Sequence, residues 1–186
     1  MDARQIRRSI RLPGYDYSKS GAYFVSICAK DRKCLFGEIV NQEMVLNDAG
    51  RMVKKWYPEL ENKFQDIRCN EYIIMPNHSH VIITNMGKAP VGADLRVCPD
   101  YKRHEHTSGE HTGSPLQRVI QWFKTMTTNE YIRGVGRHGW TPFPGKLWQR
   151  NYYEHFIRDE KELTRIREYI KNNPAQWDAD KDNPFV

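Results

Sequence analysis

Residues 78–84, with the sequence His-Ser-His-Val-Ile-Ile-Thr, decide how the chain folds. They follow a β-like run over residues 64–75, from which a Pro-Asn pair typical of turns separates them. The second half of the stretch is rich in β-branched residues and is too apolar for a strand at the edge of a sheet. We therefore predict a central strand here, paired antiparallel within its sheet.

Other strands are predicted on both sides of this stretch. Residues 22–28 are rich in β-branched and aromatic side chains and are short enough for one strand. Residues 35–40 and 44–46 are separated by Asn-Gln-Glu, which indicates a small hairpin. Alternating aromatic residues predict a further strand over residues 148–157.

Three segments have the apolar spacing of amphipathic helices. The first covers residues 49–60 and follows an Asn-Asp pair that can cap it. The second begins at the Ser-Pro pair of residues 114–115, and we expect it to end at Gly134. The third begins at the capping residue Asp159 and must end before Pro174. This order of elements predicts an α+β fold, a ferredoxin-like antiparallel sheet with helices packed on one face.

Length and composition describe one globular domain. The chain has 186 residues, of which 39% are hydrophobic and 28% charged, and a single domain usually has roughly 100–200 residues. We expect residues 1–186 to form that domain, with a basic N-terminal arm over residues 1–13 and a mobile, glycine-rich excursion over residues 86–113. No apolar run is long enough for a membrane span or a signal peptide, so a cytoplasmic protein that does not contact membranes is expected.

Charge indicates a polyanionic partner. Lys and Arg exceed Asp and Glu by 29 to 23, which gives a net charge of +6. A basic chain of this kind favours nucleic acid as a partner. Four arginines crowd the arm, while three aspartates follow residue 174. The arm residues that we expect to face phosphates are Arg4, Arg7, Arg8 and Arg11.

Two histidines are the first candidates for chemistry. Because side chains alternate along a strand, His78 and His80 point to the same face of the sheet. Two imidazoles on one face can bind a divalent metal, although a structural role is equally open for histidines considered alone. The four cysteines have no spacing typical of zinc sites or of a disulfide framework.

A tyrosine and an asparagine in the last predicted helix are the second candidates. Tyr169 falls at the side of the apolar stripe, so its ring can pack while its hydroxyl faces out. Asn173 is four residues further on, and the two polar groups can converge on one site. Taken alone, the pair would be a packing residue and a helix cap.

Two stretches carry a resemblance to a known family. They are MPNHSHVII over residues 75–83 and LWQRNYYEHFIRDEKELTRIREYIKNNP over residues 147–174. The chain resembles the REP-associated tyrosine transposases, which are single-tyrosine members of the HUH endonuclease superfamily, from about residue 8 to residue 177. One position departs from the family pattern, because Ser79 occupies a place that is normally bulky and hydrophobic.

The resemblance implies the HUH fold and a set of active-site residues. His78 and His80 are implied as metal ligands, Asn173 as a third ligand and Tyr169 as the nucleophile, with Mg²⁺ or Mn²⁺ as the metal. It further implies a transposase that cleaves and rejoins single-stranded DNA at palindromic hairpins through a 5′-phosphotyrosine, acting as a monomer or a homodimer. A tyrosyl ester keeps the energy of the broken bond, which agrees with the absence of an ATP-binding GxxxxGK[ST] loop from the sequence.

Two other functions remain open on the sequence. One is a hairpin-DNA-binding protein that no longer cuts, and the other is a phosphohydrolase that uses the histidines with water. Aromatic residues interleaved with cations near the C-terminal half favour a single-strand site, although core packing explains most of them equally well. The aromatic residues of this set are Trp122, Phe123, Trp148, Tyr152 and Tyr153, and its cations include Lys124 and Arg150, which we assign to DNA binding.

Overall fold

A computed structural model describes residues 20–87 and 115–185 of the chain. The arm with its four arginines lies outside the described residues, and so do residues 88–113 of the excursion, which include His104, His106 and His111.

The centre of the fold is a four-stranded antiparallel sheet in the order β4-β5-β1-β6. Its strands are β1 (Gly21–Cys28), β4 (Ile67–Ile74), β5 (His78–Asn85) and β6 (Tyr153–Ile157). The prediction that β5 is a central strand is confirmed, because β4 and β1 pair with it along its length. β6 is shorter than the predicted strand.

The start of the predicted last strand lies outside the sheet. Trp148 forms only an isolated bridge with Ala29.

The small hairpin is confirmed as β2 (Gly37–Val40) and β3 (Glu43–Leu46), whose turn places Asn41 and Gln42 at positive φ. The hairpin forms a two-stranded sheet of its own, separate from the four-stranded sheet.

The described residues form six helical segments, four of them between strands and two after the last strand. The α-helices are α1 (Asp48–Trp56), α2 (Glu59–Lys63), α3 (Pro115–His138) and α4 (Glu160–Asn172), and the short 3₁₀ helices are η1 (Lys30–Arg32) and η2 (Pro174–Ala179). Two of the predicted caps are present: Asn47 accepts a hydrogen bond from the backbone of Gly50, and Asp159 accepts one from the backbone of Glu162.

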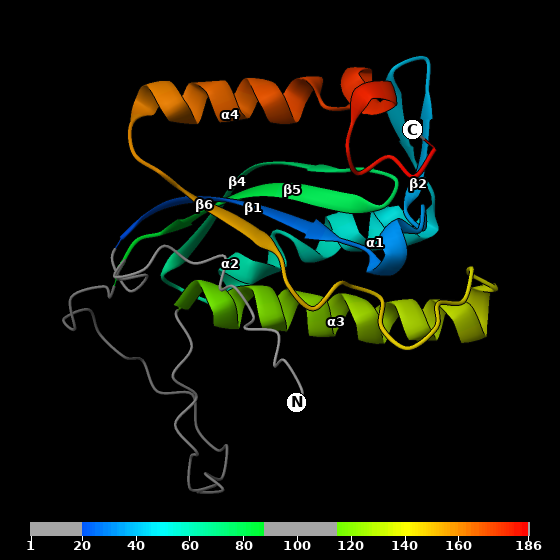
Figure 1. The fold of residues 1–186 in the computed structure, drawn as a ribbon. Helices are drawn as coiled ribbons and strands as arrows, with labels where there is room; N and C mark the ends of the chain where they lie inside the picture. The colour runs from blue at the N-terminus through cyan, green and yellow to red at the C-terminus, as the bar shows by residue number, and fades with distance from the viewer. Residues whose placement is uncertain (1–19, 88–114, 186) are drawn as a thin grey trace, which may run out of the picture.

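The helices cover both faces of the sheet (Figure 1): α4 lies on one face, and α1, α2 and α3 lie on the other. The α+β antiparallel class is confirmed, but the expectation that all helices pack on one face is wrong. β1 and β5 carry apolar side chains on both sides and so need two covers. The core on the α3 side includes Val25, Val81 and Phe123, whereas Phe24 and Ile82 belong to a smaller cluster on the α4 side.

α3 continues beyond the glycine that was expected to end it. Gly134 is buried inside the helix, and a Cβ at this position would lie 2.2 Å from the ring of Trp140. The glycine therefore gives room to the tryptophan that follows the helix, and it does not act as a stop signal.

No helix in the described part of the chain is long and apolar enough to cross a membrane.

Candidate active site

The two histidines meet on the α4 face of the sheet. Strand alternation places His78 and His80 side by side, both buried, with their Nε2 atoms 3.0 Å apart. Each ring has its other nitrogen in a hydrogen bond. His80 Nδ1 lies 2.7 Å from Ser26 Oγ on β1, and His78 Nδ1 lies 2.7 Å from Asn77 Oδ1. The Nε2 atoms therefore face the centre of the site.

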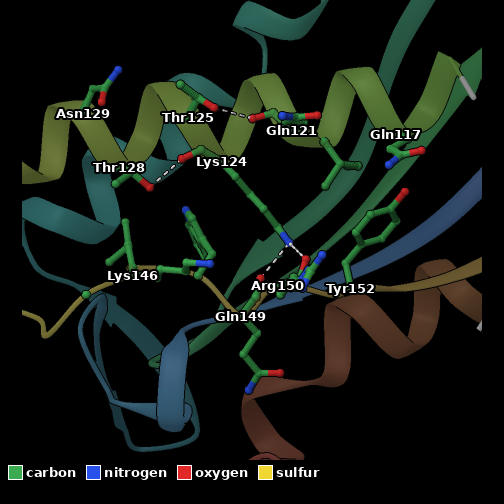
Figure 2. A pocket seen from close by; sticks show the side chains of 14 residues that line it. Gln117, Gln121, Lys124, Thr125, Thr128, Asn129, Lys146, Gln149, Arg150 and Tyr152 are labelled. Atoms are coloured by element: carbon green, nitrogen blue, oxygen red, sulfur yellow. Dashed lines mark hydrogen bonds between the residues drawn. The ribbon is translucent and has the colours of Figure 1, made fainter. Parts of the chain in front are cut away.

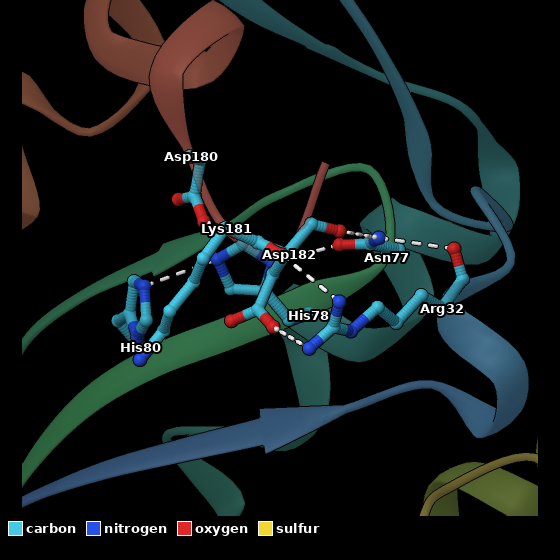
Figure 3. Close-up of polar contacts among 7 residues, drawn as sticks. All are labelled: Arg32, Asn77, His78, His80, Asp180, Lys181 and Asp182. Carbon is cyan, nitrogen blue, oxygen red and sulfur yellow. Dashed lines mark hydrogen bonds and ion pairs between the residues drawn. The ribbon is translucent and has the colours of Figure 1, made fainter. Parts of the chain in front are cut away.

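The side-chain amide of Asn77 fixes the tautomer of His78 (Figure 3). Its Nδ2 donates to the backbone carbonyls of Arg32 and Asp182, at 3.0 and 2.6 Å. These two bonds leave Oδ1 to face His78, and an amide oxygen can only accept. The hydrogen of the His78 ring is therefore on Nδ1, and its Nε2 presents a lone pair to the site.

Burial keeps the pair uncharged. It lowers the pKa of His78 and lowers the pKa of His80 well below its ordinary value. The charge of His78 on its neighbour acts on His80 in the same direction. Neutral imidazoles are the form that binds a metal cation.

Tyr169 reaches the pair from α4. Ile166 and Ile170 anchor the helix in the cluster with Phe24, while the tyrosine stays 39% exposed. Its hydroxyl lies 3.3 Å from His80 Nε2. Burial raises the pKa of this hydroxyl, so the phenol is protonated at neutral pH.

Asn173 lies at the end of the same helix with an unused oxygen. Its side chain is buried close to His78 and Tyr169, and its Oδ1 has no hydrogen-bond partner among the described residues. A buried amide oxygen without a partner is costly and rare in proteins. A cation bound beside His78 would give this oxygen a partner.

Asp180 completes the group, and sequence reasoning gave it no role. The chain after η2 turns back over the sheet, so that ligand atoms of Asp180, His78 and His80 lie within 4.8 Å of one another. An ion pair of 3.2 Å between Arg32 and Asp182 holds this segment in place. The cluster of aspartates in a basic chain was the only signal in the sequence.

These donors fit a divalent cation. Two neutral imidazole nitrogens, an orphaned amide oxygen and a carboxylate form a mixed nitrogen and oxygen set that suits first-row metals such as Mn²⁺. The His-His-Asp group can hold a metal, whose identity the donor types alone do not select.

The two cations assigned to DNA binding lie on the other side of the sheet. They line a cavity of about 640 Å³ between α3 and residues 145–152 (Figure 2). Lys124 Nζ donates to the carbonyls of Gln149, Arg150 and Asn151 at 3.0, 3.4 and 3.3 Å. Burial lowers its pKa to about 8. Lys124 therefore holds the loop, and Arg150 is exposed on it.

The aromatic residues that were candidates for base stacking differ in how far they are buried. Phe123 and Trp148 are buried in the core, and Trp122 packs against it. Tyr152 lies under Lys124 Nζ, which is 5.2 Å from its ring centre. Tyr153 alone among these five side chains is largely exposed.

His155 supports the start of the tyrosine helix. Its Nε2 lies 2.9 Å from Glu162 Oε1, and the other carboxylate oxygen of Glu162 accepts a hydrogen bond from the backbone of Arg158. These bonds tie β6 to the first turn of α4. His155 therefore helps to orient the element that carries Tyr169.

This chain is similar to proteins of known sequence and structure. No family model matches the sequence. An uncharacterized protein of Haemophilus influenzae is 39% identical over 178 residues, covering 94% of this chain and 92% of its own length. A second protein of that organism, provisionally named a REP-associated tyrosine transposase, is 24% identical over 87% of this chain and 74% of its own length.

The solved structure of a REP-associated tyrosine transposase bound to a REP hairpin is also similar. It matches with a TM-score of 0.50 and 16% identity, over 85% of this chain and 68% of that one. The chain thus has the fold of a REP-associated tyrosine transposase, which confirms the resemblance carried by its histidine and tyrosine motifs, and the similarities support a role in the transposase family. It belongs to the same family as the Haemophilus influenzae protein with 39% identity.

Proposed function

We propose that this chain is a metal-dependent transposase that cleaves and rejoins single-stranded DNA at hairpins, with Tyr169 as the nucleophile. The observation that supports the proposal most is the approach of the Tyr169 hydroxyl to 3.3 Å from His80 Nε2. This contact joins a solvent-accessible nucleophile to a site with donors for a cation. The hairpin as substrate is carried over from the structural relative, which is bound to a REP hairpin.

The residues divide the work in the following way. The Tyr169 oxygen forms a bond to phosphorus while the bond from phosphorus to the 3′ oxygen breaks, and the lost phenolic proton is balanced by the one that the 3′ oxygen takes up. The products are a 5′-phosphotyrosine and a free 3′-hydroxyl, and the reverse reaction with another 3′-hydroxyl rejoins DNA. The chemistry that a divalent cation supplies when bound is polarisation of the phosphoryl group and stabilisation of its developing charge.

The other residues prepare this step. His78, His80 and Asn173 hold the cation, and we add Asp180 to this set because its carboxylate lies beside the histidines. Asn77 keeps the His78 lone pair directed at the site. Phosphates outside the site are bound by the arginines of the arm, Arg4, Arg7, Arg8 and Arg11, and by Arg150, whose loop Lys124 holds in place.

A labelled hairpin with single-stranded flanks tests the proposal. The wild-type chain with Mn²⁺ should form a protein–DNA adduct that survives denaturation, and Tyr169→Phe should form none. Tyr72→Phe, in a tyrosine of β4 outside the site, is the matched control and should form the adduct normally. A chelator should abolish the adduct while hairpin binding persists, because the arginines need no metal.

Two results would give a different function. Turnover without an adduct, unchanged in Tyr169→Phe, would indicate hydrolysis by water at the histidine pair. Binding of hairpins with no cleavage under Mg²⁺ or Mn²⁺, across many hairpin sequences, would indicate a DNA-binding protein that does not cut.

A further inference from the structure

Tyr153 stands in the same row of the sheet as the metal-binding histidine. In the strand register, Ser26 of β1 is opposite His80 on one side and opposite Tyr153 on the other. All three residues project toward α4, because side chains at paired positions share a face. Two strand spacings of about 4.8 Å each separate His80 from Tyr153, or about 10 Å between their Cα positions.

The ring of Tyr153 is exposed but held on one side. Tyr153 is 49% exposed, and its ring meets Phe24 edge to face, with 6.2 Å between centroids. Phe24 is only 8% exposed and also packs against His80 and Tyr169, at 5.3 and 5.9 Å. One buried ring thus fixes the positions of the proposed nucleophile, a metal-binding histidine and an open aromatic surface.

Packing in the core does not explain why a tyrosine occupies this exposed position. The small cluster under α4 is formed by aliphatic side chains and Phe24, and Tyr153 is not part of it. An aromatic ring with one supported side and one open side is the geometry on which single-stranded nucleic acids stack their bases. Because every base has such a surface, the contact holds a strand without selecting its sequence.

We propose that Tyr153 forms a nucleobase subsite that stacks the base of the nucleotide next to the phosphate attacked by Tyr169. The inference rests on the proposed function and adds the contact that positions the strand. The Cα atoms of His80 and Tyr153 are separated by about 10 Å, so a base stacked on Tyr153 can belong to the nucleotide next to a phosphate at the histidines. Stacking there fixes where the strand is cut relative to the hairpin.

Binding measurements with single abasic nucleotides test the subsite independently of cleavage. Each nucleotide of the flank is replaced in turn, and affinity is measured by fluorescence anisotropy in a chelator for the wild type, Tyr153→Leu and Tyr153→Phe. At one position the loss of the base should weaken binding to the wild type and to Tyr153→Phe by roughly tenfold or more. Tyr153→Leu should bind the intact flank more weakly by the same factor, with no further loss at that position.

Ile132→Ala, which removes an exposed apolar side chain on α3, is the matched control and should show the wild-type pattern. Thermal midpoints of all variants should agree within a few degrees, because Tyr153 is half exposed. If no flank position loses its abasic penalty in Tyr153→Leu, the subsite is wrong. The subsite is also wrong if the nucleotide whose abasic penalty disappears in Tyr153→Leu is not next to the phosphate that the wild type cleaves.

The two proposals fail in different ways. An adduct from the wild type without a coupled position would leave Tyr169 as the nucleophile and remove Tyr153 from the DNA interface. A coupled position without any adduct would keep the subsite in a chain that binds hairpins but does not cut them.

Discussion

The two faces of the central sheet differ in what they bury. The face under α3 is covered by an apolar core that contains most of the large buried side chains, including Phe36, Tyr57 and Phe123. The face under α4 has a small apolar cluster and, next to it, the buried polar residues His78, His80 and Asn173. Successive residues of β5 belong to opposite faces. Neighbouring residues of β5 therefore serve different roles: one packs in the core that stabilises the fold, and the next faces the candidate active site.

Variants on the two faces should give opposite results. Phe123→Ala, in the core under α3, should lower the free energy of unfolding by about 3–5 kcal/mol. Tyr169→Phe should lower it by less than about 1 kcal/mol, because the tyrosine is partly exposed. Urea denaturation measures both values. Adduct formation by the fraction that remains folded should be retained in Phe123→Ala and lost in Tyr169→Phe, and equal activities would contradict the separation.

Asn77 should control metal affinity from outside the ligand set. Asn77→Ala removes the acceptor that fixes the His78 ring, and the affinity for Mn²⁺ measured by calorimetry should fall by about 10–100-fold. Asn77→Asp keeps an oxygen toward His78 Nδ1 and should lose less. Asn62→Ala, in an exposed asparagine of α2 on the opposite side of the sheet, serves as the matched control and should bind Mn²⁺ as the wild type does. Wild-type affinity in Asn77→Ala would show that the ring is oriented by other contacts.

The free energy of unfolding should fall in mild acid because of the two histidines buried under α4. Burial lowers the pKa of His78 and His80, so that below about pH 6.5 the unfolded chain binds protons that the folded chain does not. Between pH 6.5 and 5.5 this costs about 1 kcal/mol for each histidine that stays neutral. Urea midpoints in a chelator should therefore drop across this range. The double variant His78→Gln/His80→Gln should drop less, and an equal slope would assign the effect to other groups.

Ser79 should be the weak point of the α3 face. It is fully buried, and its hydroxyl has no hydrogen-bond partner among the described residues. Ser79→Ala removes this unsatisfied group and should raise the free energy of unfolding by about 1 kcal/mol. Metal affinity should not change, because the side chain points away from the histidines. A loss of stability on thermal denaturation would mean that the hydroxyl is satisfied in solution.

Local sequence patterns predicted the helices and strands but not which face of the sheet each helix covers. The cap at Asn47, the central place of β5 and the end of α4 before Pro174 follow from short-range rules, and the structure has all three. The side of the sheet on which α4 packs depends on how far both faces of β1 and β5 need burial. Periodicity within α4 does not contain that information.

The site could be predicted in part for the same reason. The histidine pair follows from alternation within one strand, and the approach of Tyr169 agrees with its place at the side of the helical stripe. Asp180 joins them only because the chain after α4 turns back over the sheet, which no local pattern indicates. The role of Lys124 was also hidden, since its partners are backbone carbonyls of a distant loop.

The fit of Trp140 against Gly134 has a consequence for evolution. Any side chain at residue 134 would collide with the indole ring, so the two positions cannot change independently. Relatives that replace the glycine should also replace the tryptophan with something smaller. In an alignment of many sequences the two columns should covary, and relatives with a small residue at 140 should tolerate alanine at 134.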